Sequence, residues 1–253
     1  MRNSDKGAGF TVIEMLIGLA LLSVILTVAT TLTISTMSFS MRVMGDADRL
    51  RELNSTSGYI GDNLRRALAV NTNTSLTVNG NTCSLSAGTT VYPACIAILV
   101  PEARGIIASQ PATNIDTYRI LVYRVEQRSQ LSSDFKTDSS WADANTFVIM
   151  EYRSIQCQDT PAVTPSVVPT RCVAAAQITA FTGATSIPNM TGNVVMDSLT
   201  RDPSTGSTLF PPLAYNATNN GFVLTLRTKR LERGNVVYTP RASTQVFNVT
   251  RRN

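Results

Sequence analysis

A long apolar run near the amino terminus constrains this chain more than any other feature. Residues 10–34 read FTVIEMLIGLALLSVILTVATTLTI, and Glu14 is the only charged residue among them. About 20 such residues are enough to cross a bilayer as a helix. Because a backbone in lipid must satisfy its own hydrogen bonds, we predict that this run is helical.

The residues before the run are those of a short hydrophilic leader. Residues 1–9 read MRNSDKGAG and end in the small residues Gly7, Ala8 and Gly9. A secretory signal peptide has the opposite order, with its small-residue cleavage site after the apolar stretch. We therefore expect no cleavage of the secretory type on the far side of the run.

The junction between leader and run carries a specific resemblance. The residues G9-FTVIE14-MLIGLALL resemble the class III signal of type IV prepilins and of type II secretion pseudopilins. This resemblance implies that prepilin peptidase cuts between Gly9 and Phe10, and that the new amino-terminal Phe10 is N-methylated. The resemblance covers about the first 30 residues.

Placing the Glu14 side chain in a membrane costs free energy, so we hypothesise that this residue has a function. A carboxylate at the centre of a membrane helix costs about 2.5 to 3.5 kcal/mol on insertion scales. The amine that cleavage frees on Phe10 is a possible partner, on a neighbouring subunit or on the same helix. The resemblance implies that Glu14 registers an incoming subunit against the growing filament. The alternative is that Glu14 only favours the first helical turn through the helix dipole.

Helical spacing continues beyond the apolar run. We predict one helix from Phe10 to Ala69, about 90 Å long at 1.5 Å per residue. Many major pilins have a Gly and a Pro in the membrane half, where this chain has Ser23 and Thr31, so we expect a straighter anchor and not the main shaft subunit. We expect an apolar stripe to pack on a sheet, with these members: Met37, Met41, Met44, Leu50, Leu53, Ile60, Leu64 and Leu68.

The remaining chain reads as short strands and turns. We expect an α+β pilin fold, in which the long amino-terminal helix packs on an antiparallel sheet. The predicted parts are a leader (1–9), a transmembrane half-helix (10–34), an amphipathic half-helix (35–70) and an extracytoplasmic β-rich domain (71–253). We expect YRILVYRV to form a central strand under the helix, and the predicted strands are 94–100, 117–126, 146–155, 175–181, 221–231 and 243–250.

Four cysteines follow the apolar run: Cys83, Cys95, Cys157 and Cys172. Their spacing contains no CxxC and fits disulfides better than a metal site, so no metal is expected. Four cysteines allow three connectivities, and we favour the two local pairs, Cys83–Cys95 and Cys157–Cys172. Disulfides would place the domain in an oxidising compartment. Four buried free thiols are the alternative.

The sequence offers little for catalysis. The chain has no His, the side chain that most often transfers protons near neutral pH. It also lacks the GxGxxG, Walker, HExxH and GxSxG motifs. We therefore expect no catalytic residue and no cofactor. We expect scattered carboxylates to lie on the solvated surface, namely Asp134, Asp138, Asp143, Glu151 and Asp159.

The formal net charge of +5 is compatible with an anionic partner. One group of cations could form a DNA-binding stripe if the last two strands pair, and the alternative is a solvated hairpin. This group comprises Arg227, Lys229, Arg230, Arg233, Arg251 and Arg252. DNA is therefore retained as a possible partner.

The carboxy-terminal order of FVLTLRTKRLE, a charged turn and a last strand is similar to PilW-type minor pilins and J-type pseudopilins. The resemblance implies a minor pilin that is inserted with its amino terminus in the cytoplasm and later reaches a pilus or the cell surface. Its implied partners are prepilin peptidase, other major and minor pilins, the inner-membrane assembly platform and membrane lipid. Three alternatives stay open: a type II secretion pseudopilin, an uncleaved membrane-anchored binding module and an anchored hydrolase.

Overall fold

The computed structural model describes most of the chain between Thr11 and Arg251. The described residues are 11–84, 94–101, 117–136, 146–154, 173–174, 178–200, 213–232, 234–240 and 244–251. Contacts divide the chain into two units, Met1–Asp48 and Arg49–Asn253. Gly9, Phe10, Cys157 and Cys172 lie outside the described residues, so the expectations on them stay predictions.

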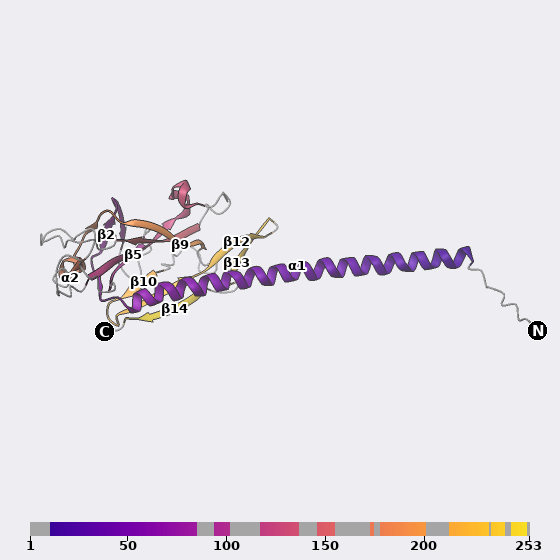
Figure 1. Ribbon diagram of the computed structural model, residues 1–253, viewed down its shortest axis with the longest axis horizontal. Coiled ribbons are helices and arrows are strands. Elements are labelled where there is room, and N and C mark those ends of the chain that lie inside the picture. The colour runs from indigo at the N-terminus through magenta and orange to yellow at the C-terminus, as the bar shows by residue number, and fades with distance from the viewer. Residues whose placement is uncertain are drawn as a thin grey trace, which may run out of the picture. The chain divides into compact units, whose positions relative to one another are not determined.

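The long helix predicted from the sequence is present as α1 (Val12–Arg65), which Figure 1 shows as one continuous element. Its first turn carries Glu14 and its last turn carries Arg65, the charge order that the helix dipole favours. The helix ends four residues before the predicted Ala69. The reason is that the Leu68 amide donates to the Leu99 carbonyl at 2.7 Å, which draws the chain into a sheet.

The larger sheet has eleven strands, in the order β13-β12-β9-β6-β5-β4-β3-β2-β8, with β1 on β4 and β7 on β5. Most pairs are antiparallel as predicted, but β2 with β8 and β3 with β4 are parallel. The strands are β1 (Ala69–Val70), β2 (Ser75–Val78), β3 (Asn81–Ser84), β4 (Ala94–Pro101), β5 (Thr117–Gln127), β6 (Thr146–Arg153), β7 (Val173–Ala174), β8 (Ser186–Ile187), β9 (Thr191–Thr200), β12 (Thr228–Glu232) and β13 (Asn235–Thr239).

The smaller sheet has three antiparallel strands, in the order β10 (Leu213–Asn216), β11 (Gly221–Leu226) and β14 (Gln245–Thr250). The prediction of one strand over 221–231 is therefore wrong. The chain leaves the smaller sheet after Leu226 and enters the larger one at Thr228, which pairs with Leu199. Arg227 is the residue between the two sheets.

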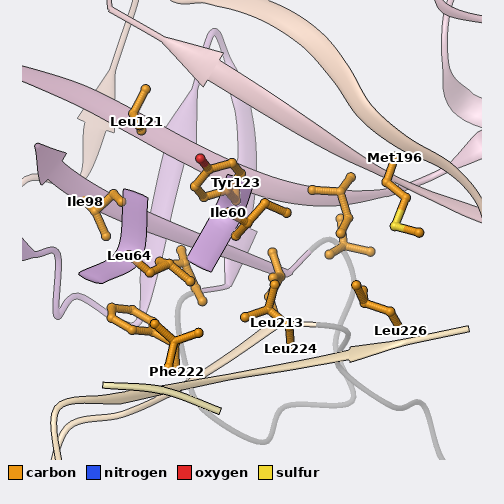
Figure 2. Close-up of a cluster of buried hydrophobic side chains, with 14 of the residues drawn as sticks. Ile60, Leu64, Ile98, Leu121, Tyr123, Met196, Leu213, Phe222, Leu224 and Leu226 are labelled. Carbon is orange, nitrogen blue, oxygen red and sulfur yellow. The ribbon is translucent and has the colours of Figure 1, made fainter. Parts of the chain in front are cut away.

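The carboxy-terminal part of α1 lies between these sheets. Ile60 and Leu64 contribute to one buried cluster with residues of both sheets. Figure 2 shows Ile98, Leu121 and Tyr123 on one side of them and Phe222 and Leu224 on the other. The central position expected for YRILVYRV is confirmed, because β5 lies between β4 and β6 and contributes to this core.

The predicted apolar stripe of α1 is only partly correct. Leu53, Ile60 and Leu64 are fully buried, but Met37, Met41, Met44, Leu50 and Leu68 are between 38% and 64% exposed. Helical geometry explains the difference for the methionines. Leu53 follows Met44 by nine residues, which is two and a half turns, so the two residues lie on opposite faces of the helix.

The predicted strand over 175–181 is also wrong. Residues 178–182 form the short helix α2 (Ile178–Thr182) instead. The side-chain amide of Asn71 donates to the carbonyl oxygens of Phe181 and Ala184, at 2.8 and 2.9 Å. These bonds tie the end of α2 to the segment after β1, and Phe181 is fully buried. A contact between residues about 110 positions apart leaves no trace in local sequence periodicity.

Candidate functional site

The described part of the predicted processing signal begins at Thr11. Thr11 precedes Val12, the first residue of α1, and therefore occupies the N-cap position. Glu14 is the third helical residue. A Thr at the N-cap with a Glu three residues later is the sequence pattern of a capping box.

Thr11 and Glu14 bond to each other in both directions. The Glu14 carboxylate accepts from the Thr11 amide at 3.0 Å and from the Thr11 hydroxyl at 2.8 Å. In return, the Glu14 amide donates to the Thr11 hydroxyl oxygen at 3.4 Å. The capping box thus gives the Thr11 amide a partner, and the Glu14 amide also donates to the Thr11 carbonyl oxygen at 3.1 Å.

This arrangement gives Glu14 donors in the uncleaved chain, and the partner that the sequence suggested for Glu14 stays a prediction. That partner, the amine of Phe10, exists only after cleavage. In the uncleaved chain Glu14 already has two donors from Thr11. The T-x-x-E spacing of residues 11–14 would have revealed this from the sequence. Both residues remain in the chain if the cut falls between Gly9 and Phe10.

The amino-terminal part of α1 has the properties of a membrane span. Every residue from Val12 to Ile34 is exposed, Glu14 is the only charged residue among them, and the helix is long and apolar enough to cross a membrane. Its hydroxyl groups bond to their own helix, as Thr27 does to the Ser23 carbonyl at 2.8 Å. Such bonds let hydroxyls enter lipid without an unsatisfied donor.

Comparison with protein families decides what this segment is. Residues 5–30 match the family model described as the prokaryotic N-terminal methylation motif. The chain carries a type IV pilin-like prepilin signal. A search of curated proteins and a search of solved structures each gave no match.

The prepilin signal supports a type IV pilin-like or pseudopilin-like protein that is anchored in a membrane. Prepilin peptidase and other pilins are the partners that such a signal suggests. The match ends at residue 30 and does not reach the β-rich domain. The PilW-type and J-type resemblance of the carboxy-terminal strands therefore stays a prediction.

One of the two local cysteine pairs lies within the described residues. Cys83 on β3 and Cys95 on β4 form a disulfide, with their Cα atoms 5.7 Å apart. Both cysteines are almost completely buried in the core on the face of the larger sheet that carries Leu76 and Val122. The first of the two favoured pairs is therefore present, and a disulfide fits an extracytoplasmic domain.

Glu151 is not a surface carboxylate, so the expectation for it was wrong. It lies on β6 and is 1% exposed. Tyr59 on α1 donates to it at 2.8 Å, and Arg153 pairs with it from the same strand. Asp134 is exposed as expected. Asp138, Asp143 and Asp159 lie outside the described residues.

The phenols around Glu151 are held in their neutral form. Burial raises the pKa of Tyr123, and the nearby Glu151 carboxylate raises it further. The pKa of Tyr59 is raised by the same two causes, burial first. Asn63 on α1 donates to the Tyr123 hydroxyl at 2.8 Å. This polar network therefore joins α1 to β5 and β6 and stabilises the position of the helix on the sheet.

Two members of the basic group near the carboxy terminus are buried and do not belong to a solvated stripe. Arg227 and Lys229 are 4% and 8% exposed. The Arg227 guanidinium donates to the Pro240 carbonyl at 3.1 Å and lies 4.8 Å from the centre of the Tyr238 ring. Arg230 pairs with Glu232. The last two predicted strands do pair, through β11 and β14, but Lys229 and Arg230 lie on β12, which pairs with β13.

Of the other cations in this group, Arg251 is partly exposed, and Arg233 and Arg252 lie outside the described residues.

The described part of the chain gathers no group of three or more His, Cys, Asp or Glu side chains that could hold a metal ion. The amino-terminal signal is the feature of this chain that most directly indicates a function.

Proposed function

We propose that this chain is a minor pilin: a membrane-inserted subunit that prepilin peptidase cuts between Gly9 and Phe10 and that is methylated at Phe10. The mature subunit enters or primes a type IV pilus used in motility, adhesion or DNA uptake. It acts by assembly and has no catalytic role. Its amino terminus is cytoplasmic before cleavage and its β-rich domain is extracytoplasmic.

One observation carries this proposal, the match of residues 5–30 to the methylation motif. The motif includes both residues of the proposed cleavage site and Glu14. Within it the Thr11–Glu14 capping box holds the acid at the first turn of α1. In this position Glu14 is four residues from the amine that cleavage would create. After cleavage, its carboxylate is near enough to exchange the Thr11 donors for that amine.

Support for a minor role comes from the β-rich domain. Both sheets contribute to the core around Ile60 and Leu64, so this part of α1 is covered on two sides by its own domain. Neighbouring subunits can reach only its remaining face, on which Asn54, Ser55 and Asp62 are exposed. A shaft subunit packs against neighbours all along its length, whereas a subunit at a filament end needs fewer such contacts.

The proposal is tested with Glu14→Leu in the full chain, compared with wild type and with Asp48→Leu as a control. Asp48 is an exposed acid on the same helix, outside the predicted membrane span. We expect Glu14→Leu to insert and to be cleaved normally, but to enter filaments about tenfold less well. Equal incorporation of Glu14→Leu and wild type would refute the assigned role of Glu14.

A type II secretion pseudopilin carries the same kind of signal, so a second experiment separates the two settings. The gene is deleted and two outputs are compared, surface pili and secreted proteins. Loss of surface pili with normal secretion is expected. Loss of secretion with normal pili would assign the chain to the secretion apparatus.

A further inference from the structure

The chain contains two Asn-Gly pairs, Asn79–Gly80 and Asn220–Gly221. This dipeptide is open to deamidation, because Gly has no side chain to hinder attack of its amide nitrogen on the side chain of the preceding Asn. Each Asn lies in the turn of a hairpin, the first between β2 and β3 and the second between β10 and β11. Both have a φ of 49°, so this backbone angle does not distinguish them.

The side chain of Asn79 is bonded at both of its polar atoms. Its amide nitrogen donates to the Met190 carbonyl at 2.7 Å, and its carbonyl oxygen accepts from the Met190 amide at 2.8 Å. Deamidation has to turn this side chain toward the Gly80 nitrogen and to release the side-chain nitrogen as ammonia. Both bonds to Met190 must break for this to happen, so the fold protects Asn79.

The side chain of Asn220 is bonded differently. Its carbonyl oxygen accepts from the Tyr215 hydroxyl at 3.0 Å, and among the described residues its amide nitrogen has no hydrogen-bond partner. A donor at a carbonyl oxygen stabilises the negative charge that develops there when a nucleophile attacks the carbon. The Tyr215 bond therefore favours attack on the Asn220 side chain, and the nitrogen that has to leave is not held.

The attacking atom is the nitrogen of Gly221, which lies in a crowded turn. Its N–H donates to the side-chain oxygen of Asn219 at 3.0 Å. A Cβ on Gly221 would lie 2.7 Å from that oxygen, so the turn requires Gly at this position. The preceding residues Ala217, Thr218 and Asn219 are exposed, so water reaches the turn. The fold thus keeps an unhindered nitrogen and water next to Asn220.

We infer that Asn220 is a site of spontaneous deamidation and that Asn79 is not. The Gly221 nitrogen forms a bond to Cγ of Asn220, and the Cγ–Nδ2 bond breaks. The proton of the Gly221 amide passes through water to Nδ2, which leaves as ammonia, and a cyclic succinimide remains. Water then opens this ring at either carbonyl and leaves Asp or isoaspartate at position 220. The reaction needs only water and does not depend on the proposed function.

The modification changes both the charge and the backbone of the smaller sheet. Either product lowers the formal net charge of +5 by one. The backbone carbonyl of Asn220 accepts from the Arg251 amide at 3.2 Å, which ties the turn to the residue after β14. Isoaspartate adds one carbon to the main chain at this point and therefore displaces that bond. A long-lived copy of the chain thus accumulates a negative charge and a weaker tie at this turn.

The test follows both Asn-Gly peptides by mass spectrometry while the detergent-solubilised full chain is kept at mildly alkaline pH. One sample is folded, and the other is reduced and unfolded in guanidinium chloride. In the folded chain we expect Asn220 to react about tenfold faster than Asn79. In the unfolded chain the bonds to Met190 are lost, so the two should react at similar rates. Equal rates in the folded chain, a faster Asn79, or an Asn220 that reacts only when unfolded would overturn the inference.

Two variants test the chemistry at position 220. Tyr215→Phe removes the hydroxyl but keeps the ring whose centre lies 4.8 Å from that of Phe222, and we expect it to slow the reaction about fivefold. An unchanged or faster reaction would contradict the part assigned to Tyr215. Asn220→Gln should end the mass gain in this peptide, because its longer side chain closes a larger ring more slowly. A mass gain that persists would place the reaction at another Asn.

Discussion

The Tyr59 hydroxyl on α1 donates a 2.8 Å hydrogen bond to the carboxylate of Glu151 on β6, across 92 residues of sequence. Glu151 is buried, and Arg153 pairs with it at the edge of the same site. A buried carboxylate is stable only when its oxygens find donors. Because one donor comes from the helix, this bond fixes α1 to the larger sheet at a defined position.

We predict that Tyr59→Phe lowers the free energy of unfolding by about 1.5–3 kcal/mol, the usual contribution of a hydrogen bond to a charged group. Tyr238→Phe is the control, since it keeps the ring under Arg227, and a change within about 0.5 kcal/mol is expected. The measurement is urea unfolding of the detergent-solubilised chain, followed by circular dichroism. Equal effects of the two substitutions would argue against a role for the bond.

Stability at alkaline pH depends on three tyrosines whose pKa is raised mainly by burial, Tyr59, Tyr123 and Tyr152. In the unfolded chain these phenols ionise near pH 10, whereas in the folded chain they keep their protons. The unfolded state then binds fewer protons, so stability is fully present below about pH 10 and falls as the pH rises further. Phenolate absorbance at 295 nm should therefore appear together with unfolding. Ionisation of every tyrosine before unfolding would contradict these pKa shifts.

The Cys83–Cys95 disulfide closes a short loop, with a sequence separation of 12. In the chain-entropy model a loop of about this length stabilises the fold by about 3 kcal/mol. We expect the double variant Cys83→Ala/Cys95→Ala to lose about that much in urea unfolding. An unchanged unfolding midpoint would show that the bond contributes nothing to stability.

Arg227 and Lys229 are buried in the fold, and we predict that they do not contribute to nucleic-acid binding. Because both are buried, we expect Arg227→Gln to destabilise the domain by about 1–3 kcal/mol and to leave DNA affinity unchanged. Fluorescence anisotropy with a labelled duplex measures the affinity. Weaker DNA binding at unchanged stability would restore the DNA-binding interpretation of this group.

The sequence was most informative where the physics is local. The apolar run of 10–34 predicts the helix directly, and the cysteine spacing placed Cys83 and Cys95 in one local pair. Alternation and apolar content predicted β4, β5, β6 and β14 close to their observed bounds. In each case the deciding information lies within one element or between near neighbours.

The failures came from contacts that sequence spacing does not contain. Glu151 looks like a surface acid in its strand, and only the approach of Tyr59 from α1 explains its burial. The segment 221–231 contains no Pro and no Gly after Gly221, so nothing local shows that it changes sheets at Arg227. Met44 and Leu53 were joined into one stripe, although their separation of nine residues places them on opposite faces.

The proposed role as a pilin subunit depends most on the cut between Gly9 and Phe10 and on methylation of the amine that this cut frees. The most direct test is mass spectrometry of the amino-terminal peptide of the mature chain, isolated from membranes and from filament fractions. We predict a peptide that begins at N-methylated Phe10. A chain that still begins at Met1 in both fractions would contradict the proposed role and would leave an uncleaved membrane anchor.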